Sequence, residues 1–463
     1  MGSKWKTSFL TDHYIISSGL SKPAKDFGTG YPFLSFKDIF YNYFLPDSLT
    51  QLVQSTDKER ATCSVRRGDV FLTRTSETMH ELGMSSVALK DYADATFNGF
   101  CKRLRPKESS ELEPEYVGYY LRSPIFRQGM LAFSTMSTRA SLNNEMISRL
   151  EISYPDRKTQ KKIANTLLSL DKKIALSRAI NQTLEQISQT LFKSWFVDFD
   201  PVIDNALDAG NPIPEALQSR AELRQKVRNS ENFKPLPADI RTLFPAEFEE
   251  TELGWVPRDW YYVPLKNLGK IICGKTPDKS NKEYYGKDYL FIKIPDMHGK
   301  VFVTNSTDKL STLGSETQIK KLIPKGSICV SCIATVGIVA INSKDCHTNQ
   351  QINSIVPNSS ILRNYLYFSM LEKNKTFHDL ASGGSATLNM NTGIFSNVLT
   401  LKPEDSVLER FQQTSEHWFG RILANENEIH TLTALRDTLL PKLISGELSL
   451  EDLPNLVTQT EPA

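Results

Sequence analysis

The sequence predicts an α+β protein made of two tandem mixed α/β domains, each followed by a long helix, with the two helices pairing as an antiparallel coiled coil. Three features predict this arrangement: an internal repeat, two long segments with helical spacing of apolar residues, and short β-rich runs that precede each of them. At 463 residues the chain is long enough for several domains with full cores.

The internal repeat consists of paired segments that keep a constant separation. Two pairs lie 258 residues apart, and a third pair is followed in each copy by a proline, Pro155 or Pro403, which are 248 residues apart. The pairs are YPFLSFKDI (31–39) with YLFIKIPDM (289–297), RGDVF (67–71) with KGSIC (325–329), and TRASLN (138–143) with GSATLN (384–389). Because two matches share one separation, we interpret the chain as two diverged copies of one unit.

Both long segments carry apolar residues mostly at steps of three and four, which is helical spacing. Within residues 159–196, polar Ser177 and Asn181 interrupt the apolar series, and Asn425 lies at the corresponding gap in the second copy. Such a stripe needs a partner. We expect the other copy to supply it, with the polar residues setting the register of the pair. The alternative, one helix in a larger bundle, requires further long helices that neither copy supplies.

The segments before the long helices are rich in short β-like runs punctuated by Gly, Pro, Asn and Asp, with one shorter helix each, over 114–130 and 362–380. The segment between the copies is acidic and proline-punctuated. The expected organisation is a first domain (1–155), a first long helix (156–200), an acidic linker (201–252), a second domain (253–403), a second long helix (404–446) and a tail (447–463).

Composition and charge constrain the class of protein. Hydrophobic residues make up 40% and charged residues 23%, which is ordinary for a soluble globular protein. Neither a membrane span nor an apolar signal core is visible, and six scattered cysteines suit a reducing compartment, so we expect a cytoplasmic protein. Residues 253–401 hold 17 Lys and Arg against 10 Asp and Glu, whereas 201–252 hold 6 against 10. A locally basic domain suits a polyanion, although surplus charge also keeps surfaces solvated.

One stretch, GKIICGKT (269–276), has the spacing of a phosphate-binding loop. Such a loop must open a helix, because the helix supplies aligned N–H groups for the phosphates. Here Pro277 follows at once, and the next residues lack an apolar stripe of helical period. The first copy has SGLSKP (18–23) at this place, which keeps the glycine and the proline only. We therefore expect a turn in both copies.

Two further patterns match metal chemistry only in part. Cys329 and Cys332 have a zinc-like spacing, with Cys346 and His347 further on, but they also fit a buried strand in which cysteine packs as a small hydrophobe. Asp156 and the Asp171-Lys172-Lys173 run have a nuclease-like spacing, yet the second group falls within the expected helix, away from the first. We predict no metal, no cofactor and no catalytic residue.

Two related but unequal domains separated by helices suit a protein that reads two blocks of one extended ligand. For duplex DNA, Lys and Arg neutralise phosphates, and Arg, Asn, Gln, Ser and Thr reach base edges. Polar loops at the ends of the β-runs supply such side chains, although each loop is equally consistent with a solvated surface. The expected DNA-binding residues are Lys37, Arg74, Thr75, Ser76, Ser137, Arg139, Lys293, Ser331, Thr335, Asn349, Gln350, Ser385 and Thr387.

Several longer segments resemble the DNA-specificity subunit of type I restriction–modification systems. They are GKTPDKSNKEYYGKDYLFIKIPDM, RRGDVFLTRT, TELGWVPRDW, LFKSWFVDFDPV at the end of the first long segment, and LRDTLLPKLISGEL near the end of the chain. Together with the first long segment, these similarities cover nearly all of the sequence. The first domain departs from the family pattern, because SGLSKPAKDFGTGYPFLSFKDI replaces its Gly-x-Thr-Pro opening, so its expected contacts are assigned less directly.

The resemblance implies that each domain is a target-recognition domain for one half of a split, asymmetric DNA sequence, with the helices fixing the gap. It also implies two methyltransferase subunits docked on the helix and linker regions, additional restriction and translocase subunits, and cofactors held by those partners. The expected partner-binding residues are Phe192, Trp195, Phe196, Leu439 and Leu443. Two other hypotheses remain open: a nuclease or ATPase built around Asp171 and Lys173 or Lys275, and a coiled-coil scaffold without DNA affinity.

Overall fold

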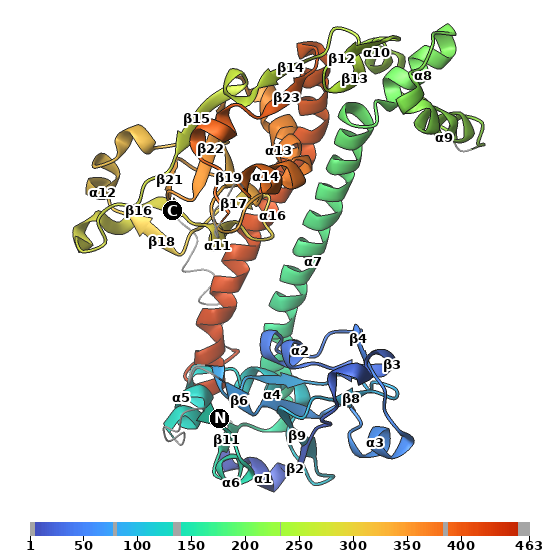
Figure 1. Cartoon of the computed structure of the whole chain (residues 1–463). Coiled ribbons are helices and arrows are strands. Elements are labelled where there is room, and N and C mark those ends of the chain that lie inside the picture. The colour runs from blue at the N-terminus through green and yellow to red at the C-terminus, as the bar shows by residue number, and fades with distance from the viewer. Residues whose placement is uncertain (1–4, 77–80, 133–139, 232, 383–387, 452–463) are drawn as a thin grey trace. The chain divides into compact units, whose positions relative to one another are not determined.

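The computed structural model describes residues 5–76, 81–132, 140–231, 233–382 and 388–451. The chain divides into two compact units, Met1–Ala175 with Thr431–Ala463, and Leu176–His430. Each unit contains one mixed α/β domain and one end of each of two long helices, α7 (Arg157–Phe196) and α16 (Asp405–Ser445). Figure 1 shows these two as the longest helices of the chain. No helix in the described ranges combines the length and the apolar character needed to cross a bilayer.

The first domain is built on a four-stranded antiparallel sheet and a three-stranded sheet. The four-stranded sheet has the order β2 (Tyr14–Ser18), β9 (Cys101–Pro106), β5 (Val70–Thr73) and β7 (Ser85–Val87). The three-stranded sheet has the order β4 (Gln51–Val53), β3 (Phe27–Leu34) and β8 (Thr96–Phe97). Two further pairs are β1 (Lys6–Phe9) with β11 (Glu151–Tyr154) and β6 (Thr75–Ser76) with β10 (Ala140–Ser141). The helices are α1 (Leu10–His13), α2 (Phe36–Tyr41), α3 (Asp57–Thr62), α4 (Pro114–Tyr120), α5 (Pro124–Ala132) and α6 (Asn144–Ser148).

The second domain repeats this topology with one added edge strand. Its larger sheet has the order β15 (Gly269–Cys273), β22 (Ile352–Pro357), β19 (Ile328–Ser331), β20 (Val339–Asn342) and the added β17 (Phe302–Val303). Its smaller sheet has the order β18 (Asp308–Leu310), β16 (Tyr285–Ile292) and β21 (Cys346–Thr348), and β14 (Tyr261–Pro264) pairs with β23 (Leu399–Lys402). The helices are α11 (Ile294–Met297), α12 (Thr312–Glu316), α13 (Arg363–Glu372), α14 (Asn374–Ala381) and α15 (Thr392–Ser396).

The two copies also share an irregularity, a β-bulge at equivalent positions of β3 and β16. In β3, Phe27 and Tyr31 both face Val53 across a bulge, and in β16, 258 residues later, Tyr285 and Tyr289 both face Leu310. Bulges re-aim a strand at one defined position, so their coincidence confirms the tandem repeat at the level of register.

The single shorter helix expected in each domain is in fact two. In the first domain the break falls between α4 and α5, where Pro124 begins the second helix. A proline disfavours helical geometry in the residue before it, so the first helix ends upstream. In the second domain Lys373 separates α13 from α14, with φ −86° and ψ 9°.

The two long helices run antiparallel. Within the second unit, Asn425 Nδ2 donates to Asn181 Oδ1 (2.8 Å), Asn181 Nδ2 donates to Glu426 Oε1 (3.1 Å), and Ser177 Oγ donates to Glu428 Oε2 (3.2 Å). Partner numbers on α16 rise as those on α7 fall. The polar gaps of the two apolar stripes therefore meet each other, as the sequence predicts, and their hydrogen bonds favour this register over its neighbours.

The same helices meet again within the first unit. Arg436 Nη1 donates to Asp171 Oδ1 (2.8 Å), and the Tyr119 hydroxyl donates to Asp171 Oδ2 (2.5 Å). Tyr119 lies on α4 of the first domain, so this carboxylate joins the domain to both helices. Ile163 and Leu443 pack in the same hydrophobic cluster.

The apolar stripe itself is placed slightly differently from the sequence prediction. Ile187 was expected in the stripe of the first long segment, and Leu435 is its equivalent 248 residues later, but their side chains are 43% and 44% exposed. Ser188 is buried instead, and its hydroxyl donates to the carbonyl oxygen of Leu184 (2.8 Å). Ser188 lies seven residues after Asn181 and four before Phe192, which keeps it on the buried face of a 3.6-residue helix while Ile187 turns outward.

The acidic linker is an ordered part of the second unit. It contains α8 (Asp200–Ala209), α9 (Gln218–Arg228), α10 (Ala238–Arg241) and the hairpin of β12 (Phe248–Thr251) and β13 (Gly254–Pro257). Three aspartates on successive turns of α8 form ion pairs with arginines of α9. The pairs are Asp200–Arg220, Asp204–Arg224 and Asp208–Arg228. The acidic composition of this segment thus serves packing between its own helices.

The buried Asn181–Asn425 contact yields a stability prediction. Asn181→Ala removes an acceptor from the buried Asn425 amide, so we expect the free energy of unfolding to fall by about 1–3 kcal/mol. Asn181→Ala/Asn425→Ala removes both polar groups, and its cost should be smaller than the summed costs of Asn181→Ala and Asn425→Ala. Urea denaturation of the four proteins measures this coupling. Additivity to within about 0.5 kcal/mol would contradict a direct contact.

Candidate nucleic-acid interface

In the first domain, several chain segments meet at one end of the main sheet. The Gly99 N–H donates to the carbonyl oxygen of Leu20 (2.9 Å), the Arg74 N–H donates to that of Phe100 (2.8 Å), and the Leu142 N–H donates to that of Arg74 (2.7 Å). We call this surface loop edge 1 and define it as residues 18–22, 74–76, 98–102 and 140–142. Segments far apart in the sequence thereby form one continuous polar rim.

The second domain assembles an equivalent surface. The Lys275 N–H donates to the carbonyl oxygen of Thr348 (3.0 Å), the Cys332 N–H donates to that of Gln351 (2.8 Å), and the Met390 N–H donates to that of Cys332 (2.8 Å). We call this surface loop edge 2 and define it as residues 273–277, 332–337, 349–353 and 388–390. Rigid strands carrying variable loops are a common way to position binding residues.

Two glycines have the same structural task in the two edges. A Cβ atom on Gly19 would lie 2.3 Å from the carbonyl oxygen of Asn98, and one on Gly274 would lie 2.2 Å from that of Asn349. Each asparagine Oδ1 also accepts a hydrogen bond from the backbone N–H two residues later, at 2.8 and 3.2 Å. Only glycine permits such a close backbone approach.

The stretch that looks like a phosphate loop is explained by this packing. Gly269 lies inside β15, and Gly274 makes the close contact described above. Thr276 Oγ1 donates to Gln350 Oε1 (2.5 Å), and the next helical element, Lys282–Tyr284, is a single 3₁₀ turn. The stretch therefore has no helix N-terminus to hold phosphates.

The residues predicted to bind DNA in the first domain fall partly on loop edge 1. Arg74 is exposed, Thr75 is half-buried, and β6 carries both Thr75 and Ser76 into the ladder with β10. Lys37 is exposed on α2. The side chain of Ser76 and all of Ser137 and Arg139 lie outside the described residues.

In the second domain the predicted residues divide into exposed and structural groups. Thr335 and Gln350 are exposed on loop edge 2. Ser331 and Asn349 are buried, and the Ser331 hydroxyl accepts a hydrogen bond from the Ile338 N–H (2.9 Å). We therefore reassign Ser331 and Asn349 to shaping the turns.

The remaining residues of the second domain that were predicted to bind DNA are Lys293, Ser385 and Thr387. Lys293 is half-buried and forms an ion pair with Asp308. Its charge is thus partly committed within the domain. Ser385 and Thr387 lie outside the described residues.

Two residues of the first domain that the sequence analysis did not single out are prominent at loop edge 1. Phe100 is 64% exposed although it is a large apolar side chain. Lys102, at the start of β9, is buried, its Nζ donates to Ser18 Oγ (2.9 Å), and no described carboxylate pairs with it. Burial, and secondly the charge of Arg74, hold the pKa of Lys102 below its usual value. Neither Lys102 nor Arg74 forms an ion pair with a carboxylate in the part of the chain that the structure describes, and two such neighbouring cations attract an anion such as a phosphate.

Equivalent positions of the two edges carry different side chains. The hydrogen-bond pattern matches Arg74 to Cys332 and Phe100 to Gln351. Strand register matches Lys102, opposite Leu72, to Asn353, opposite Val330. At these three positions the first edge has two cations and an aromatic ring, and the second has a thiol and two amides, so the two edges suit different base sequences.

The five residues expected to bind partner subunits lie inside the chain's own cores. Phe192, Trp195 and Phe196 belong to the core of the second unit, and Leu439 and Leu443 belong to that of the first. The ring centroids of Phe192 and Phe368 are 5.5 Å apart, and those of Phe196 and Tyr365 are 4.9 Å apart. We therefore reassign these five residues from partner binding to holding each domain on the helices.

The cysteines and acidic residues with metal-like spacing also have structural surroundings. Cys329 and Cys332 belong to different hydrophobic clusters, so their side chains do not converge. Burial raises the pKa of Cys329 to about 12 and that of Cys332 to about 11, which keeps both as thiols at neutral pH. Asp156 accepts hydrogen bonds from the Lys158 and Thr159 N–H groups (3.0 and 3.1 Å) and thus caps α7.

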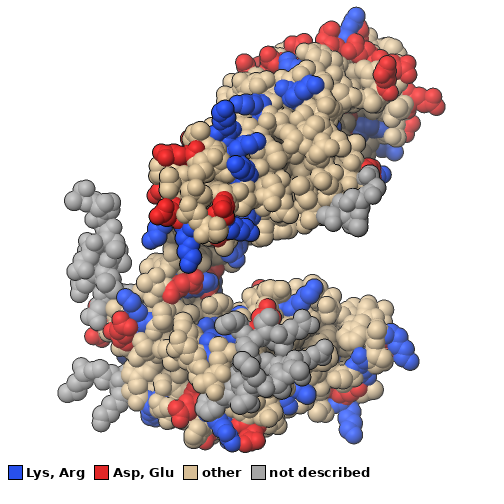
Figure 2. Space-filling view, turned by 60° about the vertical axis from the view of Figure 1, so that its left-hand side comes forward, with Lys and Arg blue, Asp and Glu red and all other residues tan. Residues whose placement is uncertain are grey.

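The surface charge of the second domain agrees with its composition. Figure 2 shows several Lys and Arg side chains on the upper body, which holds this domain, with Asp and Glu side chains among them. A surface of this kind attracts the phosphates of a nucleic acid without reading its sequence.

Comparison with known proteins identifies the family to which the chain belongs. A family model described as "Type I restriction modification DNA specificity domain" matches residues 2–186 and 257–399, one match in each copy. The chain is 38% identical to the type I restriction enzyme HindI specificity subunit of Haemophilus influenzae, over 96% of this chain and 100% of that protein. It is 24% identical to the type I restriction enzyme MjaIX specificity subunit of Methanocaldococcus jannaschii, over 97% of this chain and 94% of that protein.

A solved structure shares the fold. The S subunit of a type I restriction–modification system from M. genitalium superimposes with a TM-score of 0.53 at 12% identity, covering 95% of this chain and 96% of that chain. The family match, the HindI relative and the repeated architecture agree, and the chain belongs to the family of type I restriction–modification DNA specificity subunits.

Proposed function

We propose that this subunit recognises a bipartite, asymmetric DNA target and directs the methyltransferase and restriction subunits of a type I complex to it. The observation that carries the proposal is the pair of loop edges. One backbone frame is used twice, with different side chains at equivalent positions such as Lys102 and Asn353. One chain thereby offers two readers of unequal specificity.

Loop edge 1 and loop edge 2 are the proposed readers. In loop edge 1, Arg74 and Lys102 neutralise a phosphate, and Phe100 contacts apolar base surface such as a thymine methyl group. In loop edge 2, Gln350 and Thr335 reach base edges through their amide and hydroxyl groups. The subunit itself carries no catalytic group and no cofactor in this proposal, and the methyl transfer, ATP hydrolysis and cleavage belong to its partners.

The long helices provide a proposed docking surface for two methyltransferase subunits. Ile187 on α7 and Leu435 on α16 occupy equivalent positions, 248 residues apart, and both are exposed large apolar side chains. Two identical partners require two equivalent contact sites. This pair replaces the buried residues first assigned to partner binding.

The DNA-recognition proposal is tested by mapping adenine methylation in the source genome with this gene intact and deleted. We expect deletion to abolish methylation of one motif made of two specified blocks around a fixed gap, because the two edges read separate blocks. An unchanged methylome in cells that express this chain and its methyltransferase would contradict the proposal and favour a scaffold role.

The docking proposal is tested with Ile187→Glu and Leu435→Glu. Each change places a charge where an apolar side chain would be buried, which is worth about 1.5–3 kcal/mol, so methyltransferase affinity should fall at least about tenfold. The matched control is Leu313→Glu, because Leu313 is 45% exposed on α12, away from the long helices. Calorimetric titration of the methyltransferase into each variant measures the effect. Equal affinities for all three variants would exclude this docking surface.

A further inference from the structure

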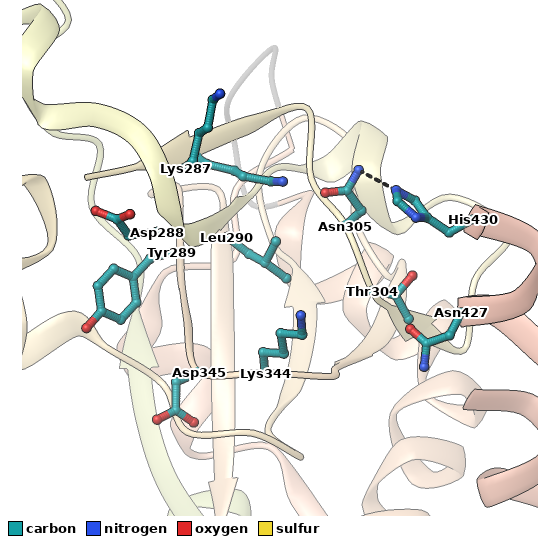
Figure 3. A pocket seen from close by; sticks show the side chains of 11 residues that line it. Lys287, Asp288, Tyr289, Leu290, Thr304, Asn305, Lys344, Asp345, Asn427 and His430 are labelled. Atoms are coloured by element: carbon teal, nitrogen blue, oxygen red, sulfur yellow. Dashed lines mark hydrogen bonds between the residues drawn. The ribbon is translucent and has the colours of Figure 1, made fainter. Parts of the chain in front are cut away.

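The second unit contains a polar cavity away from loop edge 2. Its volume is about 380 Å³, and its walls come from β16, β18, the turn between β20 and β21, the segment after β17, and α16. Figure 3 shows Lys344 pointing toward the middle of this cavity and Asn305 hydrogen-bonded to His430. The cavity is large enough for a phosphate group with part of its attached sugar.

The charged residues that line the cavity leave a net positive charge. Lys287, Lys309 and Lys344 line it, and none of them forms an ion pair with a described carboxylate. Asp288 and Asp345 also line it and accept hydrogen bonds from neutral groups. Asp288 accepts from the N–H and the hydroxyl of Thr312 at 2.8 and 2.9 Å, and Asp345 accepts from the Lys325 N–H at 2.8 Å. Three lysines against two carboxylates leave one net positive charge around the hollow, which an anion would balance.

The neutral lining groups complement such an anion. The Asn305 Nδ2 and the His430 Nε2 lie 3.3 Å apart, and Thr304 and Asn427 lie beside them on the segment after β17 and on α16. Amide, hydroxyl and imidazole groups donate hydrogen bonds to phosphate oxygens. Both charge and hydrogen-bonding capacity therefore point to an oxyanion.

The lysine cluster belongs to the second domain alone. Lys309 faces Leu290 across β16 and β18, and the equivalent position in the first domain is Leu52, which faces Pro32. The separation of 258 residues matches Lys287 to Thr29, and the registers of β21 and β8 match Lys344 to Ala93. Since the shared frame folds without these lysines in the first domain, the fold does not require them.

We propose that this cavity is a phosphate-binding site that holds a backbone phosphate of the bound DNA. The inference rests on the proposed DNA-recognition function and adds a sequence-independent anchor to it. A phosphate in the cavity contacts both the strands of the second domain and α16, and so couples DNA binding to the way this domain is held on its helix. A free nucleotide carries the same phosphate chemistry, and the experiment separates the two sources.

The first arm measures duplex binding by the full-length chain over a range of salt concentrations. Lys287→Gln/Lys309→Gln/Lys344→Gln replaces each charge with a neutral polar side chain that is one bond shorter. Each lost phosphate contact lowers the magnitude of the negative slope of log K against log salt by about 0.9, so we expect the slope to become less steep by at least that amount. The control, Lys270→Gln/Lys320→Gln/Lys321→Gln, removes three charges of the same domain outside the cavity and should keep the slope of the parent chain.

The second arm compares inorganic phosphate with sodium chloride at matched ionic strength. Phosphate should raise the thermal midpoint of the parent chain and of the control but not that of the cavity variant, because ligands stabilise the state that binds them. Equal slopes for cavity variant and control would overturn the DNA assignment. If phosphate still stabilised the parent chain in that case, the cavity would take a free phosphate-bearing molecule. If the parent chain bound all duplexes equally, the proposed function would be refuted. The thermal shift with inorganic phosphate would still show whether the cavity binds phosphate.

Discussion

Each globular domain shares its hydrophobic core with one end of both long helices, and the rest of the structure depends on this sharing. In the second unit, Phe192 and Trp195 from α7 and Phe411 from α16 pack against the domain's own aromatic side chains. In the first unit, Ile163 from α7 and Leu443 from α16 do the same. Neither copy of the repeat completes its core alone, so each domain depends on a helix from the other copy.

The helix pair adds direction and register to this shared core. Apolar contacts between two helices tolerate sliding, whereas the Asn181–Asn425 hydrogen bond is satisfied only in one alignment. Burial raises the pKa of Glu426 beside this contact, which reflects the cost of placing a carboxyl group there. The polar contacts between the two helices thus give up some stability in exchange for a defined alignment, which the proposed role as a spacer between two DNA-reading domains requires.

The architecture was predictable from sequence because periodicity and repetition are local signals. The constant separation of 258 residues identified equivalent strands, and the polar gap at Ser177 and Asn181 identified the seam. The stripe was wrong only where a serine replaces a hydrophobe, since Ser188 carries no apolar signal although it is buried. Burial of the five expected partner residues was not predictable either, because an apolar helix face looks the same whether a domain or another subunit covers it.

The site was less predictable because it is made by pairings between distant segments. Lys102 lies on a strand, and only the register of β9 with β2 and β5 places its ammonium group beside Ser18 at loop edge 1. The lysine cavity forms only where five separate segments meet. Ser331 and Asn349, in contrast, have the right chemistry for base contacts, but their side chains accept hydrogen bonds from backbone N–H groups in turns. Composition identifies the kind of ligand, and tertiary structure decides which side chains are free to meet it.

The central claim is that the two loop edges read separate parts of one target, and a three-residue graft tests it most directly. Arg74→Cys, Phe100→Gln and Lys102→Asn give loop edge 1 the side chains that loop edge 2 has at the equivalent positions. The reconstituted methyltransferase would be assayed on duplex libraries in which either the first or the second half of the target is randomised. The account predicts altered preference in one library and unchanged preference in the other, with the gap preserved. The same change in both libraries, or in neither, would contradict it.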